Sequence, residues 1–276
     1  MPPDQLPPCL LCHPARLIVF RGWQGVCPEC GSFWDLRAYS REYLYDEQYP
    51  QQRGHFDPRV GSLKVETLRR WLDQLGLLPE QYVVCEVGFG GGYCLQYLHQ
   101  TARTAFGIET IPQNLAHAAA LGVPAERLYD YDRRPVALPA AVSFWVFQDS
   151  FEHIPAHRPF LKWMAQNSSA DSMAFIVAPD ARSLSRLLLR RLWPHRSLDH
   201  TFHWSKAGLR ALLSEFGFSL VRQIRPTKAI SKRMVISHAE LACGPACARL
   251  LASVLPEFTT WFNLGELGLL FQRRSA

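Results

Sequence analysis

The chain of 276 residues lacks any long apolar run. No stretch reaches the roughly 18 consecutive apolar residues that a membrane-spanning helix needs. The first residues, Met1 to Asp4, do not form the basic segment that precedes the apolar block of a secretory signal peptide. The sequence therefore predicts a protein that neither spans a membrane nor is exported, and we expect it in the cytoplasm.

The chain also lacks a strong excess of either charge. Lys and Arg number 30 against 24 Asp and Glu, giving a formal net charge of +6 at pH 7. This mild basicity falls short of an obligate nucleic-acid binder, although it is compatible with an RNA substrate. An apolar content of 48% supports a sizeable core. No internal repeat is evident, so we expect one large domain with or without an appendage.

Cysteine is distributed unevenly along the chain, and half of the eight cysteines form two C-x-x-C pairs near the N-terminus. In a reducing compartment such pairs indicate a metal site in preference to disulfide bonds. Two pairs supply the four thiolates of a closed, tetrahedral zinc site. The segment 16–26 between them is typical of a short hairpin. We predict a zinc ribbon at residues 1–35, folded around structural zinc on Cys9, Cys12, Cys27 and Cys30, with free or redox thiols as the alternative.

A glycine-dense turn follows the strand predicted at Val83–Val87. Glycines let the backbone come close to a ligand, and the helix start behind the turn offers unpaired N–H groups. The turn lacks the last glycine of the nicotinamide-type G-x-G-x-x-G motif and has no Lys or Arg for phosphate. Glu86 instead stands two residues before the first glycine, where a carboxylate suits a ligand that carries an ammonium group. The glycines in question are Gly88, Gly90 and Gly92.

A second apolar strand, Thr104–Ile108, ends in Glu109, nineteen residues after Gly90. An acid at this separation can accept hydrogen bonds from both hydroxyl groups of a ribose. Two acids without a dedicated phosphate-binding base favour an adenosine that carries an amino acid over a pyrophosphate. The alternative is a glycine-rich turn with no ligand.

These motifs resemble those of the class I S-adenosylmethionine (SAM) dependent methyltransferases. Glu152 and His153 follow the strand predicted at Val142–Gln148, as a Glu-His pair does in a large bacterial subgroup of that family. The segment Asp199–Ser205, which precedes a helix closed by Gly217, is also similar to the subgroup. The resemblance extends over nearly the whole chain. It implies SAM as the cofactor.

The resemblance assigns a SAM site residue by residue. The turn and its acid would surround the methionine part, and the acid of the second strand would hold the ribose. An apolar residue after the second strand and an acid after a short third strand, Arg127–Tyr129, would contact adenine. Two polar residues would line the pocket towards the acceptor. In that order the residues are Glu86, Gly88, Gly90 and Gly92; Glu109; Ile111 with Asp130 or Asp132; and Gln148 with Asp149.

The order of predicted elements indicates the fold class and the domain limits. Strands and helices alternate from Tyr82 onward, which predicts a mostly parallel sheet with helices on both faces. We therefore expect the α/β class, and the resemblance implies a Rossmann-like class I methyltransferase sheet, preceded by a small zinc ribbon. We place an aromatic linker or lid at 36–62 and the methyltransferase domain at 63–276. The segment Phe218–Arg225 pairs with 267–272 as a final antiparallel pair, and Pro226–Ser237 is predicted to be a mobile loop.

Three histidines are candidates for the catalytic base. Methyl transfer to a hydroxyl group requires an aligned acceptor and removal of its proton, for which histidine is suited near neutral pH. The candidates are His153, His200 and His203, each of which could instead have a structural role. A further alternative places a divalent metal on Asp149, Glu152 and His153.

Three functions compete at this point. The resemblance favours methylation of a small molecule or saccharide, with oxygen as the acceptor atom, in a biosynthetic pathway. A zinc-ribbon-containing ribosomal RNA methyltransferase is the alternative, so a nucleic-acid partner stays possible but is not favoured. Against it, the strand at Val142–Gln148 is not followed by the Asn/Asp-Pro-Pro-aromatic tetrad of base-amine methylation, and no basic run follows Cys30. The third possibility is a SAM-binding partner without activity. The sequence makes no prediction of oligomeric state.

Overall fold

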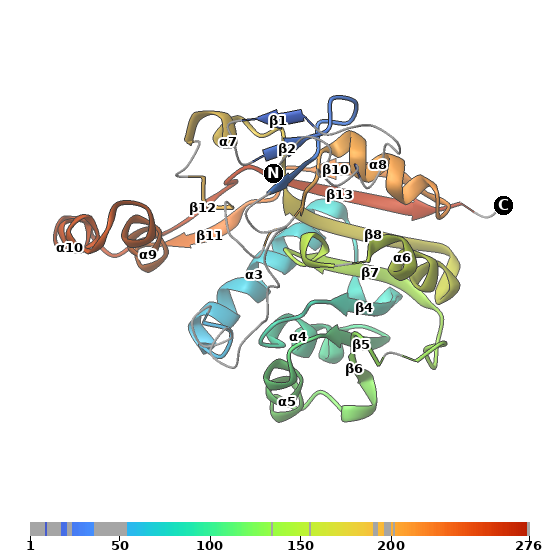
Figure 1. The fold of residues 1–276 in the computed structure, drawn as a ribbon. Coiled ribbons are helices and arrows are strands. Elements are labelled where there is room, and N and C mark those ends of the chain that lie inside the picture. The colour runs from blue at the N-terminus through green and yellow to red at the C-terminus, as the bar shows by residue number, and fades with distance from the viewer. Residues whose placement is uncertain are drawn as a thin grey trace.

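A seven-stranded sheet with helices on both faces forms the centre of the molecule (Figure 1). The computed structural model describes residues 9, 18–20, 24–35, 54–133, 135–154, 156–189, 193–195, 200 and 202–274. The strands lie in the order β10-β13-β8-β7-β4-β5-β6. Their bounds are β4 (Val83–Val87), β5 (Thr104–Glu109), β6 (Leu128–Asp130), β7 (Val142–Gln148), β8 (Ser168–Pro179), β10 (Phe218–Ile224) and β13 (Glu266–Arg273).

The strand order creates a switch point between β4 and β7. Strands β6, β5, β4, β7 and β8 run parallel, whereas β13 lies antiparallel to both β8 and β10. The chain fills one side of β4 with β5 and β6 before it returns to the other side with β7. In open α/β sheets, ligands bind beyond the carboxyl ends of the strands at such a point. The predicted α/β fold is confirmed.

The helices cover the two faces of the sheet and bury its side chains. Helices α3 (Pro58–Leu75), α4 (Tyr93–Thr101) and α5 (Pro112–Ala120) pack on one face, and α6 (His157–Gln166) and α8 (Lys206–Ser214) pack on the other. Strand β7 shows the underlying period of two. Phe144 and Val146 enter the core under α3 and α4, whereas Trp145 and Phe147 enter the core under α6 and α8. The remaining short helices are α7 (Leu184–Leu189), η2 (Pro79–Gln81), η3 (Ala125–Arg127) and η4 (Phe151–His153).

A four-stranded antiparallel sheet combines the N-terminal segment with a distant part of the chain. Its order is β1-β2-β3-β9, and the predicted hairpin is confirmed as β1 (Ile18–Phe20) paired with β2 (Gln24–Val26). Strand β3 (Phe33–Asp35) then pairs with β9 (Phe202–His203). The segment predicted as a ribbon therefore shares a sheet with the segment predicted as the methyltransferase domain, while the domain limits themselves stay predictions.

The prediction of a mobile loop at Pro226–Ser237 is wrong. This stretch forms β11 (Lys228–Ser231), which pairs with β12 (Thr259–Phe262), and then enters α9 (Lys232–Cys243). Ser231 caps the helix, since its hydroxyl accepts a hydrogen bond from the Met234 N–H. The basic composition concealed a short strand whose Ile230 is buried.

The chain between β10 and β13 forms an arm. It comprises β11, α9, α10 (Pro245–Val254) and β12, and its helices project sideways from the layered body in Figure 1. The base of the arm is attached to α3, where the Trp71 indole N–H donates to the Thr227 carbonyl at 2.9 Å. Within the described ranges, no helix is both long enough and apolar enough to cross a bilayer.

Candidate functional site

The turn after β4 is a backbone cradle that only glycine fills without strain. Gly88, Gly90 and Gly92 have φ angles of 69°, 56° and 81°, all in the left-handed region. A Cβ at Gly88 would stand 2.4 Å from the Ser150 Cβ, because the chain after β7 packs directly against the turn. The predicted ligand-cradling turn therefore has the required form.

Glu86 places a buried carboxyl group beside this turn. The Gln148 amide donates to one of its oxygens, Oε1, at 3.1 Å. The other oxygen, Oε2, is buried and accepts no hydrogen bond from the described residues. Burial raises the pKa of Glu86 to about 8. An oxygen in this state fits a cationic ligand group such as an ammonium, which would supply the missing donor.

Glu109 ties the end of β5 to the same turn. Its carboxyl group accepts hydrogen bonds from the backbone N–H groups of Gly90 at 2.8 Å, Thr110 at 2.7 Å and Ile111 at 3.2 Å. Burial raises the pKa of Glu109, and these backbone bonds oppose that effect. Oε2 accepts only the Gly90 bond among the described residues, so it keeps capacity for a further donor such as a ribose hydroxyl.

The structure separates the two aspartates that the sequence left as alternatives. Asp130 ends β6 directly beside Glu109 in the parallel register. Its side chain accepts from the Asp132 N–H at 2.8 Å and so shapes the following turn, whereas Asp132 itself is exposed. Ile111 is buried at the start of α5. Asp130 and Ile111 therefore lie next to Glu109, whereas Asp132 is exposed to solvent.

The segment before α3 covers the turn, which sequence reasoning did not assign to the site. The His55 backbone carbonyl lies where a Cβ on Gly91 would come within 1.9 Å of it. The His55 ring contacts the Asn114 side chain at 3.2 Å, and His117 donates from Nδ1 to the Gly91 carbonyl at 2.7 Å. Gly91 was the residue in the sequence that could have indicated this contact, because a fourth glycine in the turn allows a second backbone segment to come close.

A second group of charged side chains lies beyond β7, at the switch point. Asp149 has a φ of 51°, the one positive value outside glycine among the described residues, and such strain is common at functional sites. Lys228 of β11 donates to both Asp149 and Glu266. Burial lowers the pKa of Lys228, but the two carboxylates outweigh burial and leave it above its ordinary value. Burial in turn raises the pKa of Glu266 to about 7.

The three candidate histidines lie in a row of ring contacts beside this group. The ring centroids of His153 and His200 lie 4.7 Å apart, and His200 Nε2 is 3.9 Å from Glu152 Oε1. Glu152 is buried, and burial together with the charge of Asp149 raises its pKa well above the ordinary value. His203, in β9, is buried and stacked on Phe33 at 4.3 Å between ring centroids, and its ring centroid lies 5.7 Å from that of His200. The sequence offered these histidines as separate candidates, and it gave no sign of Lys228 or Glu266.

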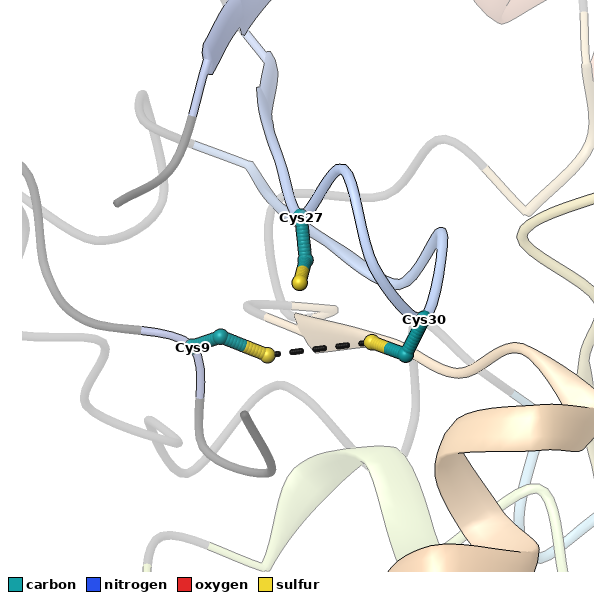
Figure 2. Close-up of side chains that lie close together, drawn as sticks. All are labelled: Cys9, Cys27 and Cys30. Atoms are coloured by element: carbon teal, nitrogen blue, oxygen red, sulfur yellow. Dashed lines mark hydrogen bonds between the residues drawn. The ribbon is translucent and has the colours of Figure 1, made fainter. Parts of the chain in front are cut away.

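The cysteine cluster forms a third feature, at the small sheet. The sulfur atoms of Cys9, Cys27 and Cys30 point towards one another (Figure 2), and all three residues are buried. Cys9 Sγ and Cys30 Sγ lie 3.7 Å apart. Thiolates at about 2.3 Å from a tetrahedral zinc lie about 3.8 Å from one another, so the spacing fits zinc. The hydrogen bond with Cys9 lowers the pKa of Cys30 to about 5, which favours the thiolate that zinc requires. Cys12 lies outside the described residues.

Comparisons with known proteins point to one family. A family model described as a methyltransferase domain matches residues 60–223, more than half of the chain. A chain from the complex between the Haloferax volcanii Trm112 methyltransferase activator and a methyltransferase superposes with a TM-score of 0.55 at 17% identity. That match covers 84% of this chain and 100% of the other. No curated protein matches the sequence.

Two further solved structures share the architecture. A protein described as a methyltransferase from Bacillus halodurans gives a TM-score of 0.52 at 14% identity, covering 74% of this chain and 97% of its own. A SAM-dependent methyltransferase from Aquifex aeolicus gives 0.51 at 13% identity, covering 83% of this chain and 100% of its own. At such low identities the structural matches show the common fold alone.

Proposed function

The chain belongs to the methyltransferase domain family and is a SAM-dependent methyltransferase, and on that premise we propose that it methylates an oxygen atom of a small molecule or saccharide. The observation that carries the cofactor site is the pair of buried carboxyl groups, Glu86 and Glu109, on either side of the glycine turn. Among the described residues, no group donates to one oxygen of Glu86, and Glu109 has spare acceptor capacity. SAM supplies an electrophilic methyl carbon on a sulfonium, together with an ammonium and a ribose.

We assign the cofactor contacts on the same basis. Glu86 would accept from the ammonium group and Glu109 from the ribose hydroxyls. Ile111 would pack on the adenine, and Asp130 would accept from its amino group, because both lie beside Glu109. Gln148 holds Glu86 in place through its amide. Gln148 and Asp149, at the end of β7, would line the path towards the acceptor.

The acceptor would bind at the carboxyl end of β7. Displacement at the methyl carbon needs an oxygen held in line and freed of its proton. His153 and His200 would be the candidates to take that proton, because their rings lie together beyond the end of β7. His203 is a positioning residue in this proposal, since its Nε2 donates to the His195 carbonyl at 3.2 Å, the same carbonyl to which His200 donates. The need for a base favours oxygen over a neutral amine as the acceptor atom.

We further propose that Cys9, Cys12, Cys27 and Cys30 bind one structural zinc ion. The three described thiols have the spacing and burial that such a site requires. Four thiolates would close the coordination sphere, so the ion would stabilise the small sheet and take no part in the chemistry. Elemental analysis of the purified protein should give one zinc per chain, and a zinc-free folded protein would contradict the assignment.

Calorimetric titration with S-adenosylhomocysteine (SAH) tests the cofactor site. Glu109→Ala should weaken binding by roughly 10- to 100-fold, because charged hydrogen bonds contribute about 1.5–3 kcal/mol each. Asp130→Asn should weaken binding less, and the matched Asp132→Asn should leave it unchanged since Asp132 is exposed. Wild-type affinity in Glu109→Ala would reject the ribose assignment.

Methyl transfer from labelled SAM tests the acceptor class. We expect transfer to hydroxylated small molecules or saccharides with little dependence on salt concentration. Transfer to structured RNA that falls steeply with salt would instead favour the RNA methyltransferase alternative, because phosphate contacts release counterions.

A further inference from the structure

Three potential metal ligands meet beside the proposed acceptor site. Glu152 and His153 belong to η4, directly after β7, and His200 precedes β9, about fifty residues further along the chain. One ligand atom from each lies within 4.8 Å of the other two. Two imidazoles and one carboxylate from separate segments are a ligand set typical of divalent first-row transition metals.

Glu152 is a buried carboxyl group that receives no hydrogen bond from the described residues. The residue is 1% exposed, and neither oxygen of its carboxyl group accepts a hydrogen bond from the described residues. Asp149 and Glu266 add further negative charge, and Lys228 is already bonded to both of them. A buried carboxylate without donors is costly unless a cation or a proton balances it. The surroundings of Glu152 therefore favour a positive group next to its oxygens.

The ring of His200 is oriented so that Nε2 faces the Glu152 carboxyl group. Nδ1 lies 3.0 Å from the His195 carbonyl, and because a carbonyl only accepts, Nδ1 carries the hydrogen. In the neutral ring Nε2 then holds the lone pair, and Nε2 is the atom that faces Glu152 Oε1 at 3.9 Å. A carbonyl bond on one ring nitrogen is the usual support for a histidine that binds metal through the other. Two acceptors that face each other across this gap leave room for an ion between them.

We propose that Glu152, His153 and His200 bind a divalent transition-metal ion that holds the acceptor oxygen in an open coordination position. Asp149, which the sequence pattern offered in place of His200, lies outside this cluster of ligand atoms, and Lys228 is bonded to one of its oxygens. Metal–ligand distances of about 2.0–2.2 Å require the three side chains to draw together by roughly 1 Å. His153 and His200 are only partly buried, so rotation of their rings can supply that movement.

The role of the ion in the reaction rests on the proposed oxygen methylation. An acceptor hydroxyl bound to the ion would have a lowered pKa and lose its proton to water. The oxygen would then form its bond to the methyl carbon as the carbon–sulfur bond of the sulfonium breaks and the neutral thioether leaves. His153 and His200 would serve as ligands, and the metal would replace an imidazole as the means of activating the hydroxyl.

Mn²⁺ titration followed by electron paramagnetic resonance tests the site on the full chain. Free Mn²⁺ gives a sharp signal that is lost on binding, and this hard ion competes poorly for cysteine thiolates. We expect one Mn²⁺ per chain, weakened at least ~100-fold in Glu152→Gln and in His200→Ala. The matched Asp149→Asn should weaken binding by at most ~10-fold, the lower end of the effect of a partner that supports a ligand, because Asp149 is bonded to Lys228 and to none of the three ligands.

SAH affinity, measured on the same variants, separates the two proposals and reports folding. Glu152→Gln should bind SAH as the wild type does, since the residue lies outside the proposed cofactor contacts. SAH binding without Mn²⁺ binding in the wild type would overturn the metal site and leave the methyltransferase assignment intact, with His200 as a protonated partner of Glu152. Equal loss of Mn²⁺ affinity in Asp149→Asn and Glu152→Gln would also overturn the proposed ligand set. Mn²⁺ binding without SAH binding would support the metal site and reject the cofactor assignment.

Discussion

At the residue scale, the buried carboxyl group of Glu86 lowers the stability of the ligand-free protein near neutral pH, and a cationic ligand group would offset this loss. The carboxyl group is fully buried, and burial raises its pKa from 4.5 to about 8. The folded chain therefore holds a proton that the unfolded chain releases at lower pH. By linkage, the contribution of Glu86 to stability is fully present below pH ~4.5 and is lost as pH rises to about 8. An ammonium beside Oε2 would reverse this loss, because it favours the charged carboxylate.

The substitution Glu86→Gln removes the titrating group and keeps its shape. The stability of the variant relative to wild type should increase by roughly 3 kcal/mol between pH 6 and pH 8.5, since each pKa unit corresponds to about 1.4 kcal/mol. Chemical denaturation at several pH values measures this change. Glu80→Gln, at an exposed position, is the control and should show no such trend. A constant difference across the pH range would contradict the raised pKa of Glu86.

At the element scale, the sequence predicts the parts that are determined locally. Strands Val83–Val87 and Val142–Gln148 have the predicted bounds because both are rich in β-branched and other apolar residues and are followed by glycine or polar residues. The glycine turn and its two acids were likewise predictable from spacing. Strand β9, with two residues, was not, since it exists only through pairing with β3. The contacts of Lys228 with Asp149 were missed for the same reason, because 79 residues separate the partners.

Two serine caps give a matched prediction about helices. Ser231 caps α9 at the arm, and Ser205 caps α8 by accepting from the Gly208 N–H at 2.9 Å. Ser205 is fully buried and also donates to the Cys30 carbonyl at 2.6 Å. Ser231→Ala should cost about 1 kcal/mol, the usual value of a cap. Ser205→Ala should cost roughly 2–4 kcal/mol, because it also leaves buried partners without hydrogen bonds.

Amide hydrogen exchange distinguishes the two effects by location. Ser231→Ala should increase exchange in α9 alone, whereas Ser205→Ala should increase it in both α8 and the segment 24–35. Ser253→Ala, an exposed substitution on α10, serves as the control. Equal global destabilisation by the two cap variants would mean that the bond between Ser205 and Cys30 adds nothing to the cap.

At the scale of the whole molecule, the small sheet connects the cysteine cluster with the proposed acceptor site. The Ser205 hydroxyl donates a hydrogen bond to the Cys30 carbonyl, and β3 pairs with β9. In β9, His203 donates to the His195 carbonyl, which also accepts a hydrogen bond from His200. The cofactor cradle is built instead on β4 and β5, at the other side of the switch point. Metal at the cysteines should therefore affect the acceptor side more than the cofactor side.

Loss of the cysteine metal site provides the last prediction. Cys27→Ser should release the zinc and lower kcat/KM for the acceptor at least ~10-fold, because an error of about 1 Å in a reacting group costs on the order of 100-fold. SAH affinity should change by less than ~3-fold, since its contacts come from β4, β5 and the turn. Cys243→Ser, at an exposed cysteine on α9, should leave zinc content, acceptor turnover and SAH affinity unchanged. Parallel loss of SAH affinity and turnover in Cys27→Ser would show that zinc supports the entire fold. Unchanged turnover in a zinc-free variant would show that β9 and His200 keep their positions without the metal, so that the pairing of β3 with β9 alone is sufficient to order the acceptor side.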